Sequence, residues 1–250
     1  MRRYPSSAVS SVSSFSFGPG PLSLAIKGLI VANVVVFLAQ TLMPGMTRAL
    51  GLMPSAVLGQ WHVWQPATYM FLHAGLFHLI FNMLALWMFG TELERIWGTR
   101  YFLKFYFGTG IGAALLTIVF SFLPFGFASA LRFSIIIGAS GAIFGVLLAY
   151  GLYFPDRPIY MYLVFPIRAK YFVMIIGAIA LYSALGSGGG VAGATHLGGL
   201  AVGYALLKGG RSHPFAEVKY RYLKWKINRV RRKFDVYSGG RADDYDRRIH

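Results

Sequence analysis

Long apolar stretches separated by short polar ones recur along this chain of 250 residues. A helix that crosses the hydrocarbon core of a membrane needs about 20 predominantly apolar residues. The pattern predicts six spans, over Leu24–Met43, Tyr69–Phe89, Phe102–Phe125, Ile135–Phe154, Tyr171–Leu185 and Val191–Leu207. The last two are short and glycine-rich, which transmembrane helices tolerate because glycine lets neighbouring backbones approach closely. The sequence therefore predicts an all-α membrane protein with a six-helix bundle.

The two ends of the chain differ in character from the predicted helical core. Residues 1–21 are rich in serine and end in Gly18-Pro19-Gly20-Pro21, which predicts a disordered tail with a sharp stop. The apolar run that follows lacks a convincing small-residue cleavage site, so we expect an uncleaved first span and no signal peptide. Residues 22–208 then form the six-helix domain, and residues 209–250 form a basic tail.

Composition supports the membrane assignment. Hydrophobic residues make up 56% of the chain and charged residues 13%, whereas a soluble domain of this size needs a far more polar surface. The chain contains no cysteine, which excludes structural disulfides, thiolate metal sites and a cysteine nucleophile.

The distribution of basic residues predicts how the spans are oriented. Of the 24 lysines and arginines, only Arg48 and Arg132 fall on one side of the predicted membrane. The positive-inside rule then places both termini in the cytoplasm, as an even number of spans requires. The connection from Pro44 to Thr68 lies outside, where Trp61 and Trp64 predict that it rests on the outer interface.

The tail from residue 209 onward combines positive charge with a helical apolar period. Its apolar side chains recur in two registers: Phe215, Val218, Tyr222 and Trp225, and Leu223, Ile227, Val230 and Phe234. This pattern predicts an amphipathic helix on anionic lipid of the inner leaflet, followed by a disordered end. A solvated charged helix without lipid contact is the alternative. The membrane context favours lipid over nucleic acid as the partner of the tail.

Two side chains capable of acid–base chemistry lie inside apolar stretches. Ser140 is framed by glycines in Gly138-Ala139-Ser140-Gly141, and His196 lies in Thr195-His196-Leu197-Gly198-Gly199. Each residue alone is more often structural in a membrane protein. Together, a serine and a histidine within reach of each other are the minimum for a nucleophile and its base. Both lie near the starts of helices that begin on the outer side, so we expect them at similar depth.

Glycines on the two helices predict close contact between them. Gly199 and Gly203 form a Gly-x-x-x-Gly face that includes His196, one turn earlier. Gly138 and Gly141 leave the backbone beside the serine uncovered and are expected to pack against that face. Such a contact would bring the imidazole to the hydroxyl.

Hydrogen-bond donors for an oxyanion are predicted from two places. The first N–H groups of the helix that carries Ser140 lack intrahelical partners, and Gly138 and Ala139 belong to the same turn of backbone. His78 and Asn82 lie four residues apart on one helical face, and both can donate. The sequence therefore predicts an oxyanion site that includes backbone and side-chain donors.

The acidic residues narrow the reaction class. All eight Asp and Glu fall on the predicted cytoplasmic side, so a Ser–His dyad is favoured over a Ser–His–Asp triad. The same distribution argues against an aspartyl intramembrane protease, and the lack of His-Glu-x-x-His argues against a zinc protease. Neither a metal nor a cofactor is expected.

At these residues the sequence resembles the rhomboid family of intramembrane serine proteases. Gly138-Ala139-Ser140-Gly141 is similar to the family's nucleophile motif, and His196 with its following glycines is similar to the family's base on the last core helix. His78-x-x-x-Asn82 resembles its oxyanion-side pair, and His73 fits the further histidine upstream. The resemblance runs over about residues 24–207.

Two further elements of the family are matched, and one position departs from it. Asn33-Val34-Val35-Val36-Phe37 resembles the family's first span, and Glu94-Arg95-Ile96-Trp97-Gly98 resembles its Glu-x-x-x-Gly element. Where some bacterial members carry a tyrosine four residues after the nucleophile, this chain has Phe144. We expect its ring to stack on His196 without the hydroxyl.

The resemblance implies an endopeptidase in a prokaryotic plasma membrane that cleaves transmembrane substrates near their outer ends. A helical substrate must unwind first because its backbone is already paired, so helix-breaking residues near the cut should be preferred. Either the fifth span or the outer connection is expected to act as the gate.

Two functions without proteolysis stay open. One is a catalytically inactive scaffold that binds transmembrane clients, although inactive relatives typically lack the serine or the histidine. The other is a channel or transporter that uses buried His and Asn as a polar path. No second half mirrors the first, and no carboxylate lies in a predicted span, which disfavours a transporter.

Overall fold

The computed structural model describes residues 19–124, 128–161, 165–185 and 190–211. Contacts group the chain into one unit up to Leu207 and a second from Lys208 onward. The predicted amphipathic helix and disordered end of the tail lie outside the described residues, as do residues 1–18. The fold below is that of the first unit.

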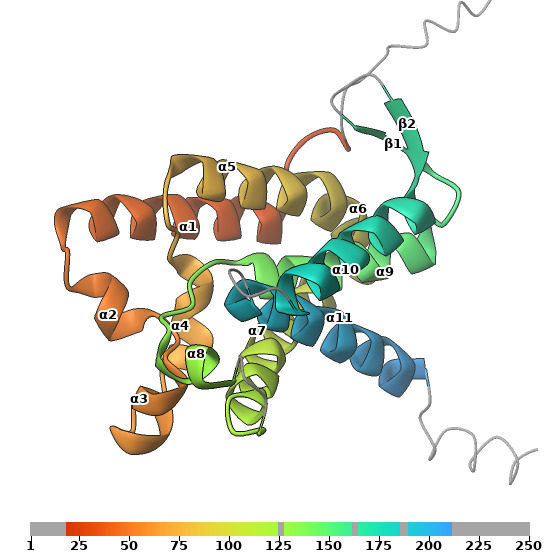
Figure 1. The fold of residues 1–250 in the computed structure, drawn as a ribbon. Helices are drawn as coiled ribbons and strands as arrows, with labels where there is room; N and C mark the ends of the chain where they lie inside the picture. Colours follow the sequence, from red (N-terminus) through yellow and green to blue (C-terminus); the bar gives the residue numbers. More distant parts are fainter. Residues whose placement is uncertain (1–18, 125–127, 162–164, 186–189, 212–250) are drawn as a thin grey trace, which may run out of the picture. The chain divides into compact units, whose positions relative to one another are not determined.

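Four helices are long and apolar enough to cross a membrane. They are α1 (Leu24–Leu42), the continuous helix Leu76–Trp97, α7 (Thr99–Phe120) and most of α11 (Gly190–Arg211). Two further apolar helices, α9 (Ser140–Tyr153) and α10 (Ala169–Leu185), are shorter, with 14 and 17 residues. Figure 1 shows α1 beside α5, the first part of the helix Leu76–Trp97, and α9 beside α10. The count of six spans therefore stays a prediction.

The second long helix is displaced from its predicted position, Tyr69–Phe89. It consists of α5 (Leu76–Ala85), a π-helical turn η2 (Leu86–Gly90) and α6 (Thr91–Trp97). Tyr69 instead lies in the 3₁₀ turn η1 (Tyr69–Phe71), where its hydroxyl donates to the carbonyl of Gly110 at 2.8 Å. The apolar pattern alone misplaced this boundary because a buried turn and a buried helix look alike in hydropathy.

At its C-terminal end, this helix continues through Glu92 and Glu94, and each of these carboxylates has a partner in the fold. Glu94 is buried and accepts from the N–H groups of Ala25 and Ile26 at 3.0 and 3.3 Å, and also from the hydroxyls of Ser23 and Thr99. A carboxylate at the first N–H groups of a helix satisfies donors that have no intrahelical partner. Glu94 therefore joins the starts of α1 and α7 to α6.

The residues just before α1 are also fixed. The Arg95 guanidinium donates to the carbonyls of Pro19 and Pro21, and the Trp87 indole N–H donates to that of Gly20 at 3.1 Å. Composition alone predicts Pro19, Gly20 and Pro21 to belong to the N-terminal tail.

The connection that is predicted to lie outside is built from short helices. They are α2 (Met46–Leu50), α3 (Pro54–Gly59) and α4 (Gln65–Thr68). The Trp64 indole donates to the carbonyl of Ala49 at 2.9 Å, and the Thr68 hydroxyl donates to that of Leu50 at 2.6 Å, so α4 closes the end of α2. Trp61 leaves 77% of its surface exposed, and its contact with the membrane interface stays a prediction.

The sequence did not predict two small elements. A short helix, α8 (Ala128–Phe133), precedes α9. Between α9 and α10, strands β1 (Pro158–Met161) and β2 (Phe165–Arg168) form an antiparallel hairpin in which Pro158 pairs with Arg168. The prediction of an all-α protein is therefore nearly, but not fully, met.

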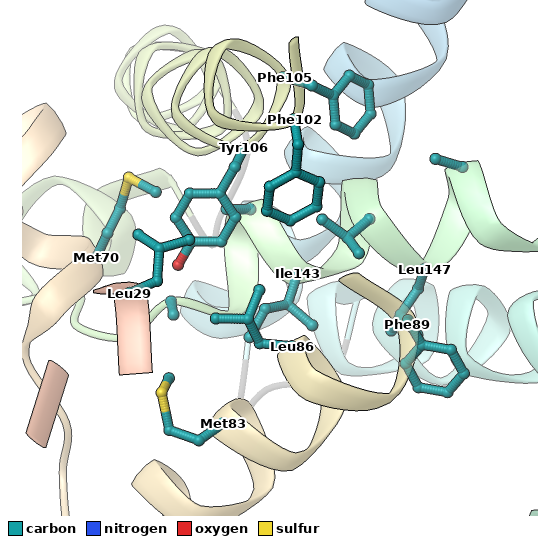
Figure 2. Packing of buried hydrophobic residues seen from close by; sticks show 14 of the residues in the cluster. Leu29, Met70, Met83, Leu86, Phe89, Phe102, Phe105, Tyr106, Ile143 and Leu147 are labelled. Carbon is teal, nitrogen blue, oxygen red and sulfur yellow. The ribbon is translucent and has the colours of Figure 1, made fainter. Parts of the chain in front are cut away.

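The helices pack with apolar side chains on both the inside and the outside. Leu86, Phe102, Tyr106 and Ile143 meet in the buried cluster that Figure 2 shows. Outside the cluster, α1 exposes a row of large apolar side chains: Val31, Val34, Val35, Leu38 and Leu42. The amide of Asn33 on the same helix is fully buried. Apolar surfaces of this extent, with polar groups turned inward, fit an integral membrane protein.

Helices α9 and α11 are in close contact, backbone to backbone. A Cβ built on Gly199 would overlap the carbonyl oxygen of Gly141, and one on Gly203 would lie 2.9 Å from the Cα of Gly145. The glycine face predicted on α11 therefore meets a second Gly-x-x-x-Gly face on α9. Gly138, expected in this contact, lies elsewhere.

Substituting a glycine of this contact should destabilise the protein more than substituting one that faces open space. Gly199→Ala should lower the free energy of unfolding in detergent by about 1–3 kcal/mol, because overpacking forces the backbones apart. Gly28→Ala, on α1 with no atom within 4 Å of the added methyl group, should be neutral or stabilising. Equal stability of the two variants in thermal unfolding would contradict the packing argument.

Candidate active site

Ser140 is the first residue of α9, and the extended segment before it is held on both sides. The N–H of Ile136 donates to the carbonyl of Leu52 at 2.8 Å, and the reverse bond is 2.9 Å long. The N–H of Gly138 donates to the carbonyl of Tyr69 at 2.9 Å. Gly138 has φ +127°, which a residue with a side chain rarely adopts, so a glycine is needed for the chain to turn into the helix here.

The structure brings Ser140 and His196 together. The Nε2 atom of His196, on α11, lies 2.8 Å from the Oγ atom of Ser140, although 56 residues separate them. The contact sits directly beside the meeting of Gly141 and Gly199, which sets the spacing of the two helices. Both side chains are partly buried. At this distance the hydroxyl can donate its proton to the imidazole.

The ring of Phe144 covers one face of the imidazole. The two ring centroids lie 4.1 Å apart with an interplanar angle of 7°, which is a stacked arrangement. Ser140 and Phe144 are four residues apart on α9, so one helical face carries both the hydroxyl and the ring. The stacking expected from the sequence is therefore present, and it restricts rotation of the His196 ring.

A pair of threonines, not singled out from the sequence, fastens α11 next to His196. The Thr195 and Thr117 hydroxyls lie 3.1 Å apart, and both residues are buried. Each hydroxyl also reaches a carbonyl of its own helix, that of Ala113 for Thr117 at 2.8 Å and that of Val191 for Thr195 at 3.4 Å, so either hydroxyl can donate to the other. This bond fixes α11 on α7 one residue from the imidazole. Single threonines in apolar helices give no local signal of such a pairing.

His78 lies against the turn that precedes Ser140. A Cβ built on Gly138 would lie 2.9 Å from the His78 Nε2 atom and 3.6 Å from the Ser140 Oγ atom. The N–H of Ala74 donates to His78 Nδ1 at 3.2 Å. Since a backbone N–H can only donate, Nδ1 accepts, and the neutral ring carries its proton on Nε2. The N–H of the His78 ring therefore lies against Gly138, two residues before the serine.

Asn82 is buried one turn further along α5. Its amide nitrogen donates to the carbonyl of His78 at 2.7 Å, which uses one of its two N–H groups within its own helix. The structure therefore places His78, rather than Asn82, directly against the turn before Ser140.

His73 lies outside the helix in which the sequence placed it, three residues before α5 begins. Its ring packs edge-on against His78 at a centroid distance of 5.0 Å. Its backbone is held by Gln40, which accepts from the His73 N–H and donates to the His73 carbonyl, both at 3.0 Å. Gln40 also donates to the Thr47 hydroxyl at 3.0 Å, so one amide joins α1, α2 and the segment before α5.

No described carboxylate approaches His196. Of the described acidic residues, Glu92 pairs with Arg157, Glu94 binds the start of α1, and Asp156 pairs with Lys170 at 2.8 Å. Within the described ranges, no three His, Asp or Glu side chains gather as metal ligands. The site as described consists of a hydroxyl, imidazoles, amides and backbone N–H groups.

Comparison with known proteins agrees with the motifs. A model of the rhomboid domain matches residues 60–211. The chain is 31% identical over 214 residues to Rhomboid protease AarA of Providencia stuartii, covering 78% of this chain and 74% of that protein.

Two other relatives match over shorter regions. Rhomboid protease GluP of Bacillus subtilis is 39% identical over 40% of this chain, and Rhomboid protein 1, mitochondrial, of Saccharomyces cerevisiae is 34% identical over 53%. The matched regions cover 17% and 38% of those two proteins, so the chain spans well under half of their length. The family model covers more than half of this chain and both site motifs, and the chain belongs to the rhomboid family.

Proposed function

We propose that this protein is an intramembrane serine endopeptidase that cleaves transmembrane protein substrates with a dyad of Ser140 and His196. The observation that carries the proposal is the 2.8 Å contact between Ser140 Oγ and His196 Nε2 within an apolar helical domain. The similarity to the Providencia and Bacillus relatives, both rhomboid proteases, supports it.

The first chemical step transfers one proton and forms one bond. His196 Nε2 takes the hydroxyl proton of Ser140 while Oγ attacks the carbonyl carbon of the scissile peptide. The tetrahedral intermediate then breaks its C–N bond, and the imidazolium gives its proton to the leaving amine. His196 then takes a proton from water while the water oxygen attacks the acyl ester. The ester C–O bond breaks, and the imidazolium returns the proton to Oγ, which restores the serine.

The oxyanion is held by donors on both sides of Ser140. The first N–H groups of α9 are directed toward its N-terminal end and carry the positive end of the helix dipole. The Nε2–H of His78 lies on the other side, across Gly138. Asn82 keeps one N–H for the same charge and, through its bond to the His78 carbonyl, braces the turn that carries the imidazole.

The proposal includes a topology of six spans with both termini in the cytoplasm of a prokaryote. The two shorter apolar helices, α9 and α10, complete the six. The dyad then lies toward the outer side, and substrates are cut near their outer ends after local unwinding. The gate is α10 or the outer connection, and the basic tail binds anionic lipid of the inner leaflet. A scaffold without activity is the alternative.

Removing the nucleophile should abolish activity and preserve the fold. Ser140→Ala should give no cleavage of a reconstituted transmembrane substrate and no labelling by a fluorophosphonate probe, because both need an activated hydroxyl. Thermal unfolding in detergent should match wild type. Cleavage at the wild-type rate by Ser140→Ala would rule out the dyad, and a wild-type protein that neither cleaves nor labels would favour the scaffold.

The oxyanion donors should affect turnover without being indispensable. His78→Ala should lower kcat by roughly 10²-fold, as is typical for the loss of one donor, with residual cleavage remaining. Asn82→Ala should also lower kcat. An unchanged kcat in either variant would remove that residue from the oxyanion site.

The threonine pair should act on turnover through the position of His196. Thr195→Val should lower kcat about threefold with KM unchanged, since an interhelical hydrogen bond in a membrane protein is worth about 0.6 kcal/mol on average. Thr195→Ser should restore the rate. Thr109→Val on α7 is the matched control, because its buried hydroxyl has no hydrogen-bond partner among the described residues.

A double variant separates positioning from general loss of stability. Adding Thr117→Val to Thr195→Val should cost nothing further, because both changes remove the same bond. Additive losses, or a loss of the same size in Thr109→Val, would show that the threonine pair does not position the base.

A further inference from the structure

Tyr69 contacts the backbone on both sides of Ser140. The N–H of Gly138 donates to the Tyr69 carbonyl at 2.9 Å, two residues before the serine. On the other side, a Cβ built on Gly141 would lie 2.8 Å from the Tyr69 hydroxyl oxygen, which is closer than a real Cβ atom comes to another heavy atom. One residue of η1 therefore borders the nucleophile motif, residues 138–141, at its beginning and at its end.

The Tyr69 side chain is held in one place. It leaves 1% of its surface exposed, and its hydroxyl donates to the carbonyl of Gly110 on α7 at 2.8 Å. A hydrogen bond of this kind compensates a buried phenol for the loss of water. The neighbouring Met70 packs on the same glycine so closely that a Cβ built on Gly110 would overlap the Met70 side chain. The hydroxyl oxygen of Tyr69 is therefore fixed relative to the backbone of α7.

The Tyr69 hydroxyl lies where three helices meet. The Cβ built on Gly141 of α9 would also lie 3.3 Å from the Cβ of Ala113 on α7 and 3.3 Å from the Cγ2 atom of Thr195 on α11. The two residues of the dyad are direct sequence neighbours of this glycine and this threonine, so the same junction carries both. The phenol oxygen thus fills the space beside the first turn of α9 that a side chain at position 141 would need.

We propose that Tyr69 is a positioning residue for the nucleophile, an inference that rests on the proposed protease function. Its carbonyl fixes Gly138, whose φ of +127° turns the chain into α9, and its hydroxyl limits how closely Gly141 approaches α7. Both contacts act on the backbone of the motif, through which Tyr69 aims the Ser140 hydroxyl at His196. Small displacements of this backbone matter, because proton transfer requires Oγ and Nε2 to stay within hydrogen-bond distance.

Removing one atom from the full chain in detergent tests this role. Tyr69→Phe should lower kcat for a transmembrane substrate and the rate of fluorophosphonate labelling by roughly tenfold, with KM unchanged. A misplacement of about 1 Å can cost about 10²-fold, and a shift of half that size corresponds to roughly tenfold. Tyr106→Phe on α7 is the matched control and should keep the wild-type rate. It removes the same atom from a fully buried tyrosine (Figure 2), whose hydroxyl has no hydrogen-bond partner among the described residues.

A second reference separates positioning from loss of stability. Thr99→Val removes a hydroxyl bond of 2.7 Å to Glu94 at the first residue of α7. It should lower the midpoint of thermal unfolding without lowering kcat at temperatures where the protein is folded. A rate loss in Tyr69→Phe that either reference variant reproduces, or a change in KM alone, would overturn the role of Tyr69. A wild-type protein that neither cleaves nor labels would instead refute the proposed function itself.

Gly141→Ala tests the contact with the Tyr69 hydroxyl. Alone, this variant should slow labelling, because its methyl group meets the Tyr69 oxygen at 2.8 Å. In the Tyr69→Phe background that oxygen is absent, so the methyl group should cause a smaller further loss of labelling rate and of unfolding midpoint than in wild type. Equal losses in the two backgrounds would show that the hydroxyl and the nucleophile motif are not coupled, and would overturn the proposal.

Discussion

The meeting of Gly141 with Gly199 is the contact on which the site depends. Ser140 precedes one of these glycines and His196 lies one turn before the other, so the backbone distance at this point sets the distance from hydroxyl to imidazole. A methyl group on Gly199 would overlap the backbone of Gly141, which cannot turn away as a side chain can. The proposed dyad therefore lies where the two backbones are in direct contact.

Polar side chains in this fold hold separate segments of the chain together. Glu94 gathers the starts of α1 and α7, Gln40 holds the segment before α5, and Thr195 bonds Thr117. Within an apolar environment no water replaces a missing partner, so each such bond selects one arrangement of helices over others. None of the three contacts is made by Ser140 or His196. They hold α1, α7, α11 and the segment before α5, the elements from which the proposed donors and base reach Ser140.

The sequence predicted what is encoded locally. Ser140 and His196 stand in short glycine motifs inside apolar runs, and Phe144 follows the serine by one helical turn, so neighbouring residues reveal all three. Tyr69 and Gln40 could not be found that way. Their partners, such as Gly110 and the backbone of His73, come from segments more than 30 residues away, and nothing in the local pattern marks the pairing. The sequence also did not determine which glycine of α9 contacts which glycine of α11.

The predicted ends of the second long helix were wrong because hydropathy does not distinguish a buried helix from a buried turn. The turn at Tyr69 is as apolar as the helix that follows it, so an apolar run cannot distinguish the two. The second long helix continues through Glu92 and Glu94 because each carboxylate has a partner that only the folded chain supplies. The polar residues that looked like the end of a span are thus the residues that fasten it.

The absence of a described carboxylate near His196 changes what keeps the base in place. In a triad, an acidic residue holds the imidazole by a charged hydrogen bond. Here the ring is held by stacking on Phe144, by the serine hydroxyl and by a helix whose rotation the Thr195 bond fixes. These forces are short-ranged and depend on fit, so they fall off steeply with small displacements. It follows that helix packing, more than local charge, determines how well this base is aligned, and that changes far from the dyad can reach it through α7 and α11.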